Sequence, residues 1–549
     1  MKWDLLNKSS AVSRKSLINI LLKNRGIKTE KAKKEFINPI DPMKIKLSQL
    51  GIAEKDLDEV VNRIDQARSN KEFVIIYGDY DADGITASAV AWETLHDAGV
   101  DVFPFVPDRF EDGYGIKAKS VLSLKSRYPK LKLIITVDNG IVAYEGVKEA
   151  KKLGIDVIVI DHHQKGEKLP DTNFVIHSTE VCGSALVWFV SREIYKRLVK
   201  GNYESKIREK LQLSAIGTVA DQLPLLGINR SVVKYGLTEL NDTKRPGLLA
   251  LFKEAGITEA GPYEIGFVIA PRINSMGRLR HGLESLRLLC TKDKVRGIQL
   301  AEVIGKVNLE RQKVVDSVVE HALSITENKS AKIIVLADEK YHEGVIGLAA
   351  ARLVEKYYRP AIVISKSKDV SKASARSIPG FNIIETIRKL QEYYLEGGGH
   401  PMAAGFSINT GNIDIFREKI NLLAQKLLTD DLLQKNLKVD CRLSFSAINY
   451  DLLKEISLFE PTGVGNKEPV FFSEKVQLLD VKFVGKDKRH LKLKLKQGEH
   501  VFDSIYFGGG EIYSNLAPQM KIDVAYSIED NSWNGYRNIQ LKLKDLHFS

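Results

Sequence analysis

Cysteine is scarce in this chain of 549 residues: Cys182, Cys290 and Cys441 lie far apart and are odd in number. They form no CxxC pair, so we expect neither a structural zinc site of that kind nor a disulfide framework. Buried thiols kept reduced in a cytoplasm are the simplest interpretation. We therefore expect a cytoplasmic protein.

Long apolar runs are absent as well. No stretch approaches the roughly 18–20 consecutive apolar residues of a membrane span, and no apolar run follows a basic cluster at the N-terminus. We therefore expect no membrane partner and no secretory signal. The hydrophobic content of 44% is typical of globular cores, and the length allows several domains.

An excess of acidic residues is also lacking, because 82 Lys and Arg stand against 70 Asp and Glu and give a net charge of +12. A basic balance favours a polyanionic partner, since Lys and Arg that neutralise phosphates release counterions. The same balance is found in proteins with an ordinary solvated, lysine-rich surface. Charge indicates nucleic-acid binding only together with more specific features.

Short β-branched runs alternate with helical patterns between residues 46 and 290, which predicts parallel βαβ units in one domain. The segment before it, 1–45, is expected to form short helices and a loop. The predicted strands are 73–77, 132–137 and 156–160, and the predicted helices are 85–98, 117–126 and 142–153.

Three further regions follow, and together they predict a multidomain α/β protein. A connecting helix is expected within 291–328, because apolar residues recur there at helical spacing. Residues 329–432 are predicted to form a second α/β domain. Residues 433–549 contain short alternating strands with Gly-rich turns, which indicates an antiparallel β-barrel of the OB type.

Acidic residues and histidines stand where the predicted strands end. Asp79, Asp81 and Asp83 alternate directly after the first strand, and an extended turn would project all three to one side. Such carboxylates repel each other unless cations lie between them. The other candidates are Asp138, then Asp161 with His162 and His163, and finally Asp221, which follows an apolar run.

Carboxyl ends of parallel strands meet at one edge of a sheet, so these side chains are expected to gather there. A set rich in carboxylates, with one or two imidazoles, suits Mg²⁺ or Mn²⁺ better than structural zinc. It is large enough for two ions about 3.5–4 Å apart, the arrangement that serves phosphoryl transfer. A coincidental polar rim would not place Asp at three successive strand ends.

Four of these segments, in this order, are similar to the motifs of the DHH phosphoesterase superfamily: GDYDADG, TVDNG, IDHH and GTVADQLPL. Further segments resemble those of the RecJ exonuclease family within it. They are PDRFEDGYG (107–115), PRINSMGRL (271–279), HEGVIGLAAARL (342–353), SARS (374–377), GGGHPMAAGFSI (397–408) and FEPTGVGNKEPVF (459–471). The resemblance runs from about residue 70 to 472 and implies DHH and DHHA1 domains followed by an OB-type barrel.

The resemblance implies roles for individual residues of the acidic edge, with two Mg²⁺ or Mn²⁺ ions bound there. Asp138 would bridge both ions, and His163 would act near the scissile phosphate as a proton donor or electrostatic stabiliser. Asp79 would be a further ligand or a group that supports one. The other implied ligands are Asp81, Asp83, His162 and Asp221.

The resemblance also implies substrate-binding residues. Arginine grips phosphate oxygens in a bidentate fork, which positions a strand without reading its sequence. The 5′ end would be bound by Arg109. The other implied contacts are Arg272, Asn274, Arg278, Arg376, Gly398, Gly399 and His400. Taken singly, each is as well explained by a solvated charge or a plain turn.

One predicted barrel strand alternates Leu491, Leu493 and Leu495 with Lys492, Lys494 and Lys496. One face would pack inward, and the other would carry ammonium groups suited to single-strand binding. An edge strand protected by lysines would show the same pattern.

The resemblance implies a single-stranded-DNA-specific 5′→3′ exonuclease that releases 5′-mononucleotides in DNA repair and recombination. It also implies a helicase and a single-strand-binding protein as partners, and we expect a monomer. A nanoRNase or cyclic-dinucleotide phosphodiesterase is one alternative, although these generally lack the barrel. A non-catalytic binding protein is another, although the intact carboxylates speak against it.

Overall fold

The computed structural model describes residues 1–8, 14–199, 201–325, 331–485, 487–533 and 536–548. The chain divides into two compact units. The smaller unit contains residues 1–2, 274–281 and 299–436, and the larger contains 3–273, 282–298 and 437–549. The predicted boundary between the connecting helix and the second α/β domain, at 328 and 329, lies outside the described residues.

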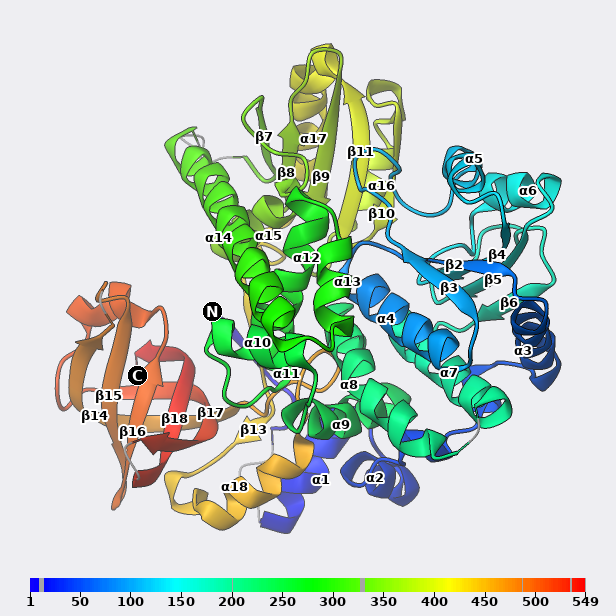
Figure 1. Ribbon diagram of the computed structural model, residues 1–549. Coiled ribbons are helices and arrows are strands. Elements are labelled where there is room, and N and C mark those ends of the chain that lie inside the picture. Colours follow the sequence, from blue (N-terminus) through cyan, green and yellow to red (C-terminus); the bar gives the residue numbers. More distant parts are fainter. Residues whose placement is uncertain (9–13, 200, 326–330, 486, 534–535, 549) are drawn as a thin grey trace. The chain divides into compact units, whose positions relative to one another are not determined.

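A five-stranded parallel sheet forms the centre of the larger unit, with the strand order β3-β2-β4-β5-β6 (Figure 1). All its pairings are parallel, which confirms the predicted parallel sheet. The strands are β2 (Phe73–Tyr77), β3 (Asp101–Phe105), β4 (Leu131–Val137), β5 (Asp156–Asp161) and β6 (Phe174–His177). β3 and β6 were not among the predicted strands.

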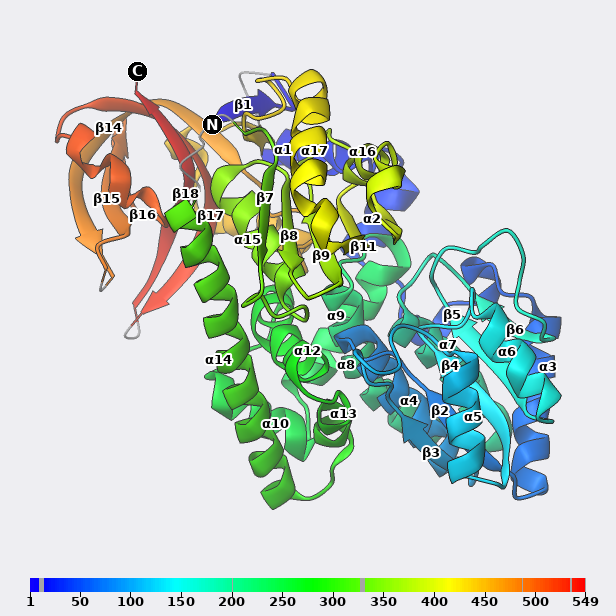
Figure 2. The same ribbon diagram turned by 90° about the horizontal axis from the view of Figure 1, so that it is seen from above.

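Helices cover both faces of this sheet (Figure 2). α5 (Ala118–Arg127) and α6 (Tyr144–Lys152) bury their apolar side chains against one face. α4 (Ala82–Asp97) and α7 (Gly183–Leu198) pack on the other. Because both faces are covered, the central strands read as continuous β-branched runs and not as alternating ones.

Further helices extend the larger unit beyond the sheet. Their bounds are α1 (Arg14–Asn24), α2 (Glu30–Ile37), α3 (Glu54–Ser69), α8 (Tyr203–Ala220), α9 (Gly227–Asn241), α10 (Pro246–Ala255), α11 (Pro262–Glu264) and α13 (Leu283–Cys290). A π-helix, Ile265–Ile269, precedes α12 (Ala270–Leu279), most of which belongs to the smaller unit, as does most of the long α14 (Lys294–Ile325). No helix among the described residues is both long and apolar enough to cross a membrane.

The N-terminal segment contains a strand that its sequence did not suggest. β1 (Lys2–Leu5) and β12 (Asn436–Val439) form a two-stranded sheet. The indole of Trp3 donates a hydrogen bond of 2.8 Å to Asp545 of the barrel. KWDL alternates polar and apolar residues, but four residues are too short a run to predict a strand without the distant strand that pairs with it.

A mixed five-stranded sheet, in the order β10-β11-β9-β8-β7, forms the centre of the smaller unit. α15 (Ile346–Tyr357) packs with one apolar cluster, and α16 (Ile383–Arg388) and α17 (Ile413–Leu427) pack with another. This arrangement confirms the predicted second α/β domain. The strands are β7 (Ile334–Asp338), β8 (Ala361–Ser365), β9 (Val370–Arg376), β10 (Glu396–His400) and β11 (Ala403–Asn409).

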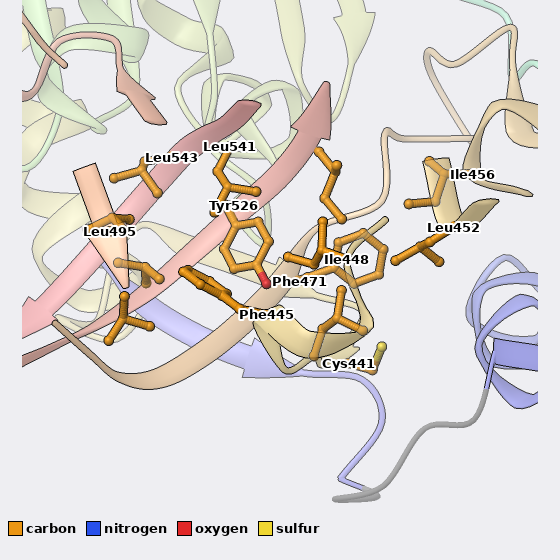
Figure 3. Close-up of a cluster of buried hydrophobic side chains, with 14 of the residues drawn as sticks. Cys441, Phe445, Ile448, Leu452, Ile456, Phe471, Leu495, Tyr526, Leu541 and Leu543 are labelled. Carbon is orange, nitrogen blue, oxygen red and sulfur yellow. The ribbon is translucent and has the colours of Figure 1, made fainter. Parts of the chain in front are cut away.

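The C-terminal strands close into a barrel in the order β14-β15-β16-β18-β17, with β17 pairing back to β14. Its core gathers Phe445, Phe471, Tyr526 and Leu541 (Figure 3). The Tyr526 hydroxyl lies 2.8 Å from Ser473 Oγ. The strands are β13 (Cys441–Arg442), β14 (Phe471–Val484), β15 (His490–Gln497), β16 (His500–Tyr506), β17 (Lys521–Trp533) and β18 (Tyr536–Phe548), with α18 (Tyr450–Ile456) preceding β14. The barrel is mainly antiparallel, as predicted, but β13 pairs parallel with β14, and β16 with β18.

Candidate metal centre

The carboxyl edge of the parallel sheet gathers the acidic residues and histidines predicted from the sequence. Their possible ligand atoms form three groups, and within each group these atoms lie within 4.8 Å of one another. The groups are Asp79, Asp81 and Asp138; Asp83, His162 and Asp221; and Asp138, His162 and His163. Asp138 and His162 each belong to two groups, so the groups form one connected site.

The three aspartates after β2 do not all lie in an extended turn, as the prediction had assumed, because the last of them is already helical. α4 begins at Ala82, with Asp81 as its N-cap, whose Oδ1 accepts a hydrogen bond of 3.0 Å from the Gly84 amide. Asp83 therefore lies in the first helical turn, where successive side chains rotate and do not alternate. Asp79 and Asp81 share a group with Asp138, and Asp83 shares one with His162 and Asp221, while burial, and then the charges of all three aspartates, raise the pKa of Asp138.

The Asp83 carboxylate is held by the N-terminus of α7. It accepts hydrogen bonds from the backbone amides of Gly183 at 2.7 Å and Ser184 at 2.9 Å. Free amides and the helix dipole both favour a negative charge at this position. A Cβ atom on Gly183 would lie 2.4 Å from Asp138 Oδ1, so only glycine allows α7 to begin here.

Asp138 combines burial, an unusual backbone conformation and an unsatisfied oxygen. Its φ is +62°, in the left-handed region that Asp and Asn tolerate better than most residues. Its Oδ1 accepts no hydrogen bond within the described part of the chain, although His162 Nε2 lies 3.1 Å away. Burial, and then the charge of Asp83, raise the pKa of Asp138.

Asp79 shows the same combination beside it. Its Oδ1 is buried and likewise accepts no hydrogen bond among the residues described. Burial and the charge of Asp81 raise the pKa of Asp79. An unpaired anionic oxygen is costly to bury. Divalent cations, which prefer carboxylate oxygens, would remove that cost, so these residues fit a metal site.

Asp221 and His162 complete the other side of the site. Asp221 follows the last residue of α8, and burial together with Asp83 raises its pKa to about 8. His162 Nε2 lies 3.7 Å from Asp221 and 3.8 Å from Asp83. Burial lowers the pKa of His162, which favours the neutral imidazole that binds metals.

His163 is held by Asp161, a residue noted at the strand end but given no role from the sequence. Asp161 Oδ1 lies 2.8 Å from His163 Nδ1 and accepts a hydrogen bond of 3.1 Å from its amide. Burial has the largest single effect and lowers the pKa of His163. The hydrogen bond and charge of Asp161, together with the charges of Asp221 and Asp79, outweigh burial, and the pKa is raised. The Tyr114 hydroxyl, also not predicted, lies 3.2 Å from the His163 ring. Its only signal in the sequence is the segment PDRFEDGYG.

Two predicted substrate contacts, Arg109 and Arg272, lie in the larger unit. The Arg109 guanidinium stands 5.1 Å from the centre of the Tyr80 ring, and its charge is among those that oppose the raised pKa of Asp79. Arg272 donates to Glu254 at 2.8 Å and to the Val268 carbonyl at 3.1 Å. Arg109 is thus within electrostatic reach of the acidic edge.

The predicted contacts of the smaller unit are Asn274, Arg278, Arg376, Gly398, Gly399 and His400. Arg278 donates to the Gly344 carbonyl at 3.3 Å, and a Cβ on Gly347 would lie 3.0 Å from the Arg376 guanidinium. Both arginines therefore approach residues 344–347, where α15 begins. Ala403 of β11 pairs with Arg376 of β9 on one side and with His400 of β10 on the other. Arg376 and His400 therefore lie at the same level of the sheet, one strand apart.

The lysines of the barrel lie on the outer face of β15, as predicted. Leu491, Leu493 and Leu495 are buried, whereas Lys492, Lys494 and Lys496 are not. β15 pairs with β14 on one side and β16 on the other, so the edge-strand interpretation was wrong. Lys492 stands directly opposite Lys482 and is 3.4 Å from Asp503.

Comparison with known families agrees with this arrangement. The "DHH family, N-terminal domain" model matches residues 73–218, the "DHHA1 domain" model matches 330–426 and the "RecJ OB domain" model matches 439–545. The fold and the acidic edge therefore define a DHH-type protein with an OB barrel.

Relatives that are similar over most of this chain show which family within this class the chain belongs to. The single-stranded-DNA-specific exonuclease RecJ of Bacillus subtilis is 34% identical over 96% of this chain and 67% of the relative. The protein of the same name from Haemophilus influenzae is 30% identical over 88% of this chain and 89% of the relative. The chain belongs to the RecJ family.

Solved structures share the whole fold. The crystal structure of RecJ in complex with Mn²⁺ from Thermus thermophilus is 26% identical, with a TM-score of 0.84, over 100% of this chain and 80% of that one. The complex of RecJ with Mg²⁺ from the same organism is 25% identical, with a TM-score of 0.77, over 100% and 78%.

Proposed function

We propose that the chain is a metal-dependent exodeoxyribonuclease that degrades single-stranded DNA from its 5′ end and releases 5′-mononucleotides. The observation that carries this proposal is the connected carboxylate site, in which buried oxygens of Asp79 and Asp138 accept no hydrogen bond from the residues described. Membership of the RecJ family supports the single-stranded substrate and a role in DNA repair and recombination.

Two Mg²⁺ or Mn²⁺ ions are the proposed cofactors, and Thermus RecJ has been crystallised with each of these metals. Asp79, Asp81 and Asp138 would hold one ion. Asp138 would also serve the second, which Asp83, His162 and Asp221 would hold. When bound, such ions activate water and stabilise charge on the phosphate and on the leaving oxygen.

The protein side chains would orient the substrate and complete the charge balance. Asp161 holds the His163 imidazole in one orientation and favours its charged form. A charged His163 would stabilise the phosphate oxygens or donate a proton to the leaving 3′ oxygen. Arg109 would bind the 5′ end, since guanidinium forks suit phosphates. The outer lysines of β15 would hold the strand further from the point of cleavage.

A cytoplasmic monomer that works with a helicase and a single-strand-binding protein is the proposed cellular setting. The sequence resemblance described above suggests these partners, and the three free cysteines of the described chain support a reducing compartment. Co-elution with a purified single-strand-binding protein, and the mass of the free chain by light scattering, would test the partner and the monomer separately.

Digestion of end-labelled single strands with Mg²⁺ or Mn²⁺ tests the activity directly. We expect mononucleotides from a free 5′ end, no cleavage with a chelator, and protection by a 5′ duplex block. A preference for two- to four-nucleotide substrates over long strands would instead indicate a nanoRNase or dinucleotide phosphodiesterase. Metal-independent binding without turnover would indicate a non-catalytic protein.

A further inference from the structure

The segment LFEPTGVGNK, residues 458–467, leads into the barrel and has no part in the function proposed above. It lies in the larger unit, as does the turn that carries Asp221. The backbone amide of Leu225, four residues after Asp221, donates a hydrogen bond of 2.7 Å to the Val464 carbonyl. The segment therefore touches the loop that follows a candidate metal ligand.

Two glycines bring the 458–467 segment this close. A Cβ atom on Gly463 would lie 2.7 Å from Leu225 Cδ1. A Cβ atom on Gly465 would lie 2.8 Å from Pro224 Cβ, and Gly465 has a φ of +73°, in the region that favours glycine. Any larger residue at Gly465 would push against a proline ring that cannot change rotamer.

Local hydrogen bonds shape the Asp221 turn. α8 ends in a left-handed residue, Gln222, with a φ of +59°. The amides of Gln222 and Leu223 close the helix on the Val219 and Thr218 carbonyls, each at 3.2 Å. Beyond the end of α8, the Leu226 amide donates to the Pro224 carbonyl at 2.8 Å, and α9 begins at Gly227. Contact with the 458–467 segment supplies a further point of attachment.

Arg230 of α9 anchors the segment. Its side chain is fully buried, and its five N–H groups donate to five main-chain carbonyls. The acceptors are Phe36 at 2.7 Å, Leu458 at 3.0 Å, Phe459 at 3.0 Å, Glu460 at 2.7 Å and Pro461 at 3.1 Å. No carboxylate of the described chain forms an ion pair with Arg230, so its role is to bind backbone in a defined shape.

Asn466 closes the other end of the segment. Its Nδ2 donates to the Phe459 carbonyl at 2.7 Å and the Pro461 carbonyl at 2.9 Å, and its Oδ1 accepts from Arg25 Nε at 2.9 Å. The Gly463 amide donates to the Asn466 carbonyl at 2.8 Å. The turn that touches Leu225 is thus held at both ends.

We propose that Arg230 and the 458–467 segment are positioning elements for Asp221. The lead-in to the barrel would then belong to the scaffold of the metal centre as well as to the DNA-binding domain. The inference rests on the proposed function, because it takes Asp221 as a metal ligand. It requires that disturbing the segment weakens metal binding although no ligand and no DNA-binding residue is removed.

Gly465→Ala in the full-length chain tests this. Changes around metal ligands typically lower affinity about 10–100-fold, so we expect Mn²⁺ affinity, measured by calorimetry, to fall about 10-fold. In the metal-free protein, deuterium exchange at residues 221–226 should accelerate, and single-strand affinity in a chelator should not change. Gly498→Ala is the matched control, because Gly498 has a φ of +61° and nothing within 4 Å of its Cβ position. It should leave all three measurements unchanged.

Further variants separate the possible results. If Gly465→Ala does not fold, Gly463→Ala decides, because the flexible Leu225 side chain can give way. Arg230→Lys keeps the charge but has fewer donors and should show the same two changes. Wild-type Mn²⁺ affinity and wild-type exchange in a folded Gly465→Ala or Gly463→Ala would overturn the positioning role. Unchanged Mn²⁺ binding in Asp221→Asn would instead show that Asp221 is not a metal ligand, and it would contradict the proposed metal site.

Discussion

Asp161 Oδ1 lies 2.8 Å from His163 Nδ1, and the other Asp161 oxygen accepts a hydrogen bond of 2.9 Å from the Ile141 amide. The carboxylate is therefore fixed at both oxygens, and it fixes the imidazole in turn. It also raises the pKa of His163 against the opposing effect of burial. One carboxylate at the sheet edge thus serves a histidine, whereas its neighbours form the candidate metal site.

His163→Ala should lower turnover far more than substrate affinity, since the proposed role of the imidazole is at the reacting phosphate. Loss of a general acid costs typically 10²–10⁴-fold in rate, and we expect a fall in kcat of about that size. Single-turnover kinetics alongside single-strand binding would measure both quantities. An exposed histidine of the barrel provides the control, and His500→Ala should change neither. An effect on affinity alone would remove His163 from the catalytic step.

Asp161→Asn should reproduce part of this loss while the imidazole remains. The amide can still contact His163 but no longer favours its charged form, so kcat should fall less than in His163→Ala. The double variant should be no slower than His163→Ala alone, because both changes act on one group. Additive losses would show that Asp161 acts independently of His163.

Asp138→Asn should abolish cleavage without lowering the stability of the metal-free protein. Asparagine tolerates the φ of +62°, which alanine would not, so the backbone is preserved. Since burial and neighbouring carboxylates raise the pKa of Asp138, a neutral amide relieves repulsion. Thermal unfolding with a chelator should give a Tm at or above that of the wild type. Near-normal cleavage by this variant would contradict the two-ion assignment, and Asp101→Asn, at the opposite end of the sheet, should remain active.

Metal binding should stabilise the protein more at pH 8 than at pH 6. The pKa of Asp221 is raised to about 8, so in the metal-free protein this group favours folding below about pH 4. That contribution is lost as pH rises through about 8, where the carboxylate ionises. A bound cation replaces the proton, so the difference in Tm with and without Mg²⁺ should grow over this range. In Asp221→Asn that growth should be smaller, and a difference independent of pH in the wild type would argue against a cation at Asp221.

Replacing Lys492, Lys494 and Lys496 by Gln should weaken binding of long single strands. The log–log salt slope should become shallower by up to ~0.7 for each phosphate that the barrel no longer neutralises. Cleavage of oligonucleotides too short to reach the barrel should hardly change. The matched control removes the same charge from exposed helices, with Gln at Lys31, Lys55 and Lys152. Equal slopes for the two triple variants would exclude β15 from the DNA-binding surface.

Much of this fold follows from local pattern. The runs at 73–77 and 156–160 form β2 and β5, as predicted. Consecutive β-branched residues favour a strand that is buried on both faces, and this preference can be recognised from the run itself. Likewise, the alternation of leucine and lysine from 491 to 496 places the lysines outward whatever strand lies beside it. The carboxylates at the strand ends gathered as expected because parallel strands all end at the same edge.

The sequence by itself therefore determined the parallel sheet, the acidic edge and the family to which the chain belongs. Tertiary structure alone decided which carboxylates share a group, because the start of α4 at Ala82 places Asp83 in a helix, and His162 and Asp221 come to it from distant parts of the chain. It also made β15 an internal strand through closure of the barrel, and it brought Val464 to Leu225. The physical reason is the separation in sequence of the residues that interact. Helix and strand periods depend on adjacent residues. The ligand groups, the closure of the barrel and the contacts of Arg230 depend on packing between distant segments.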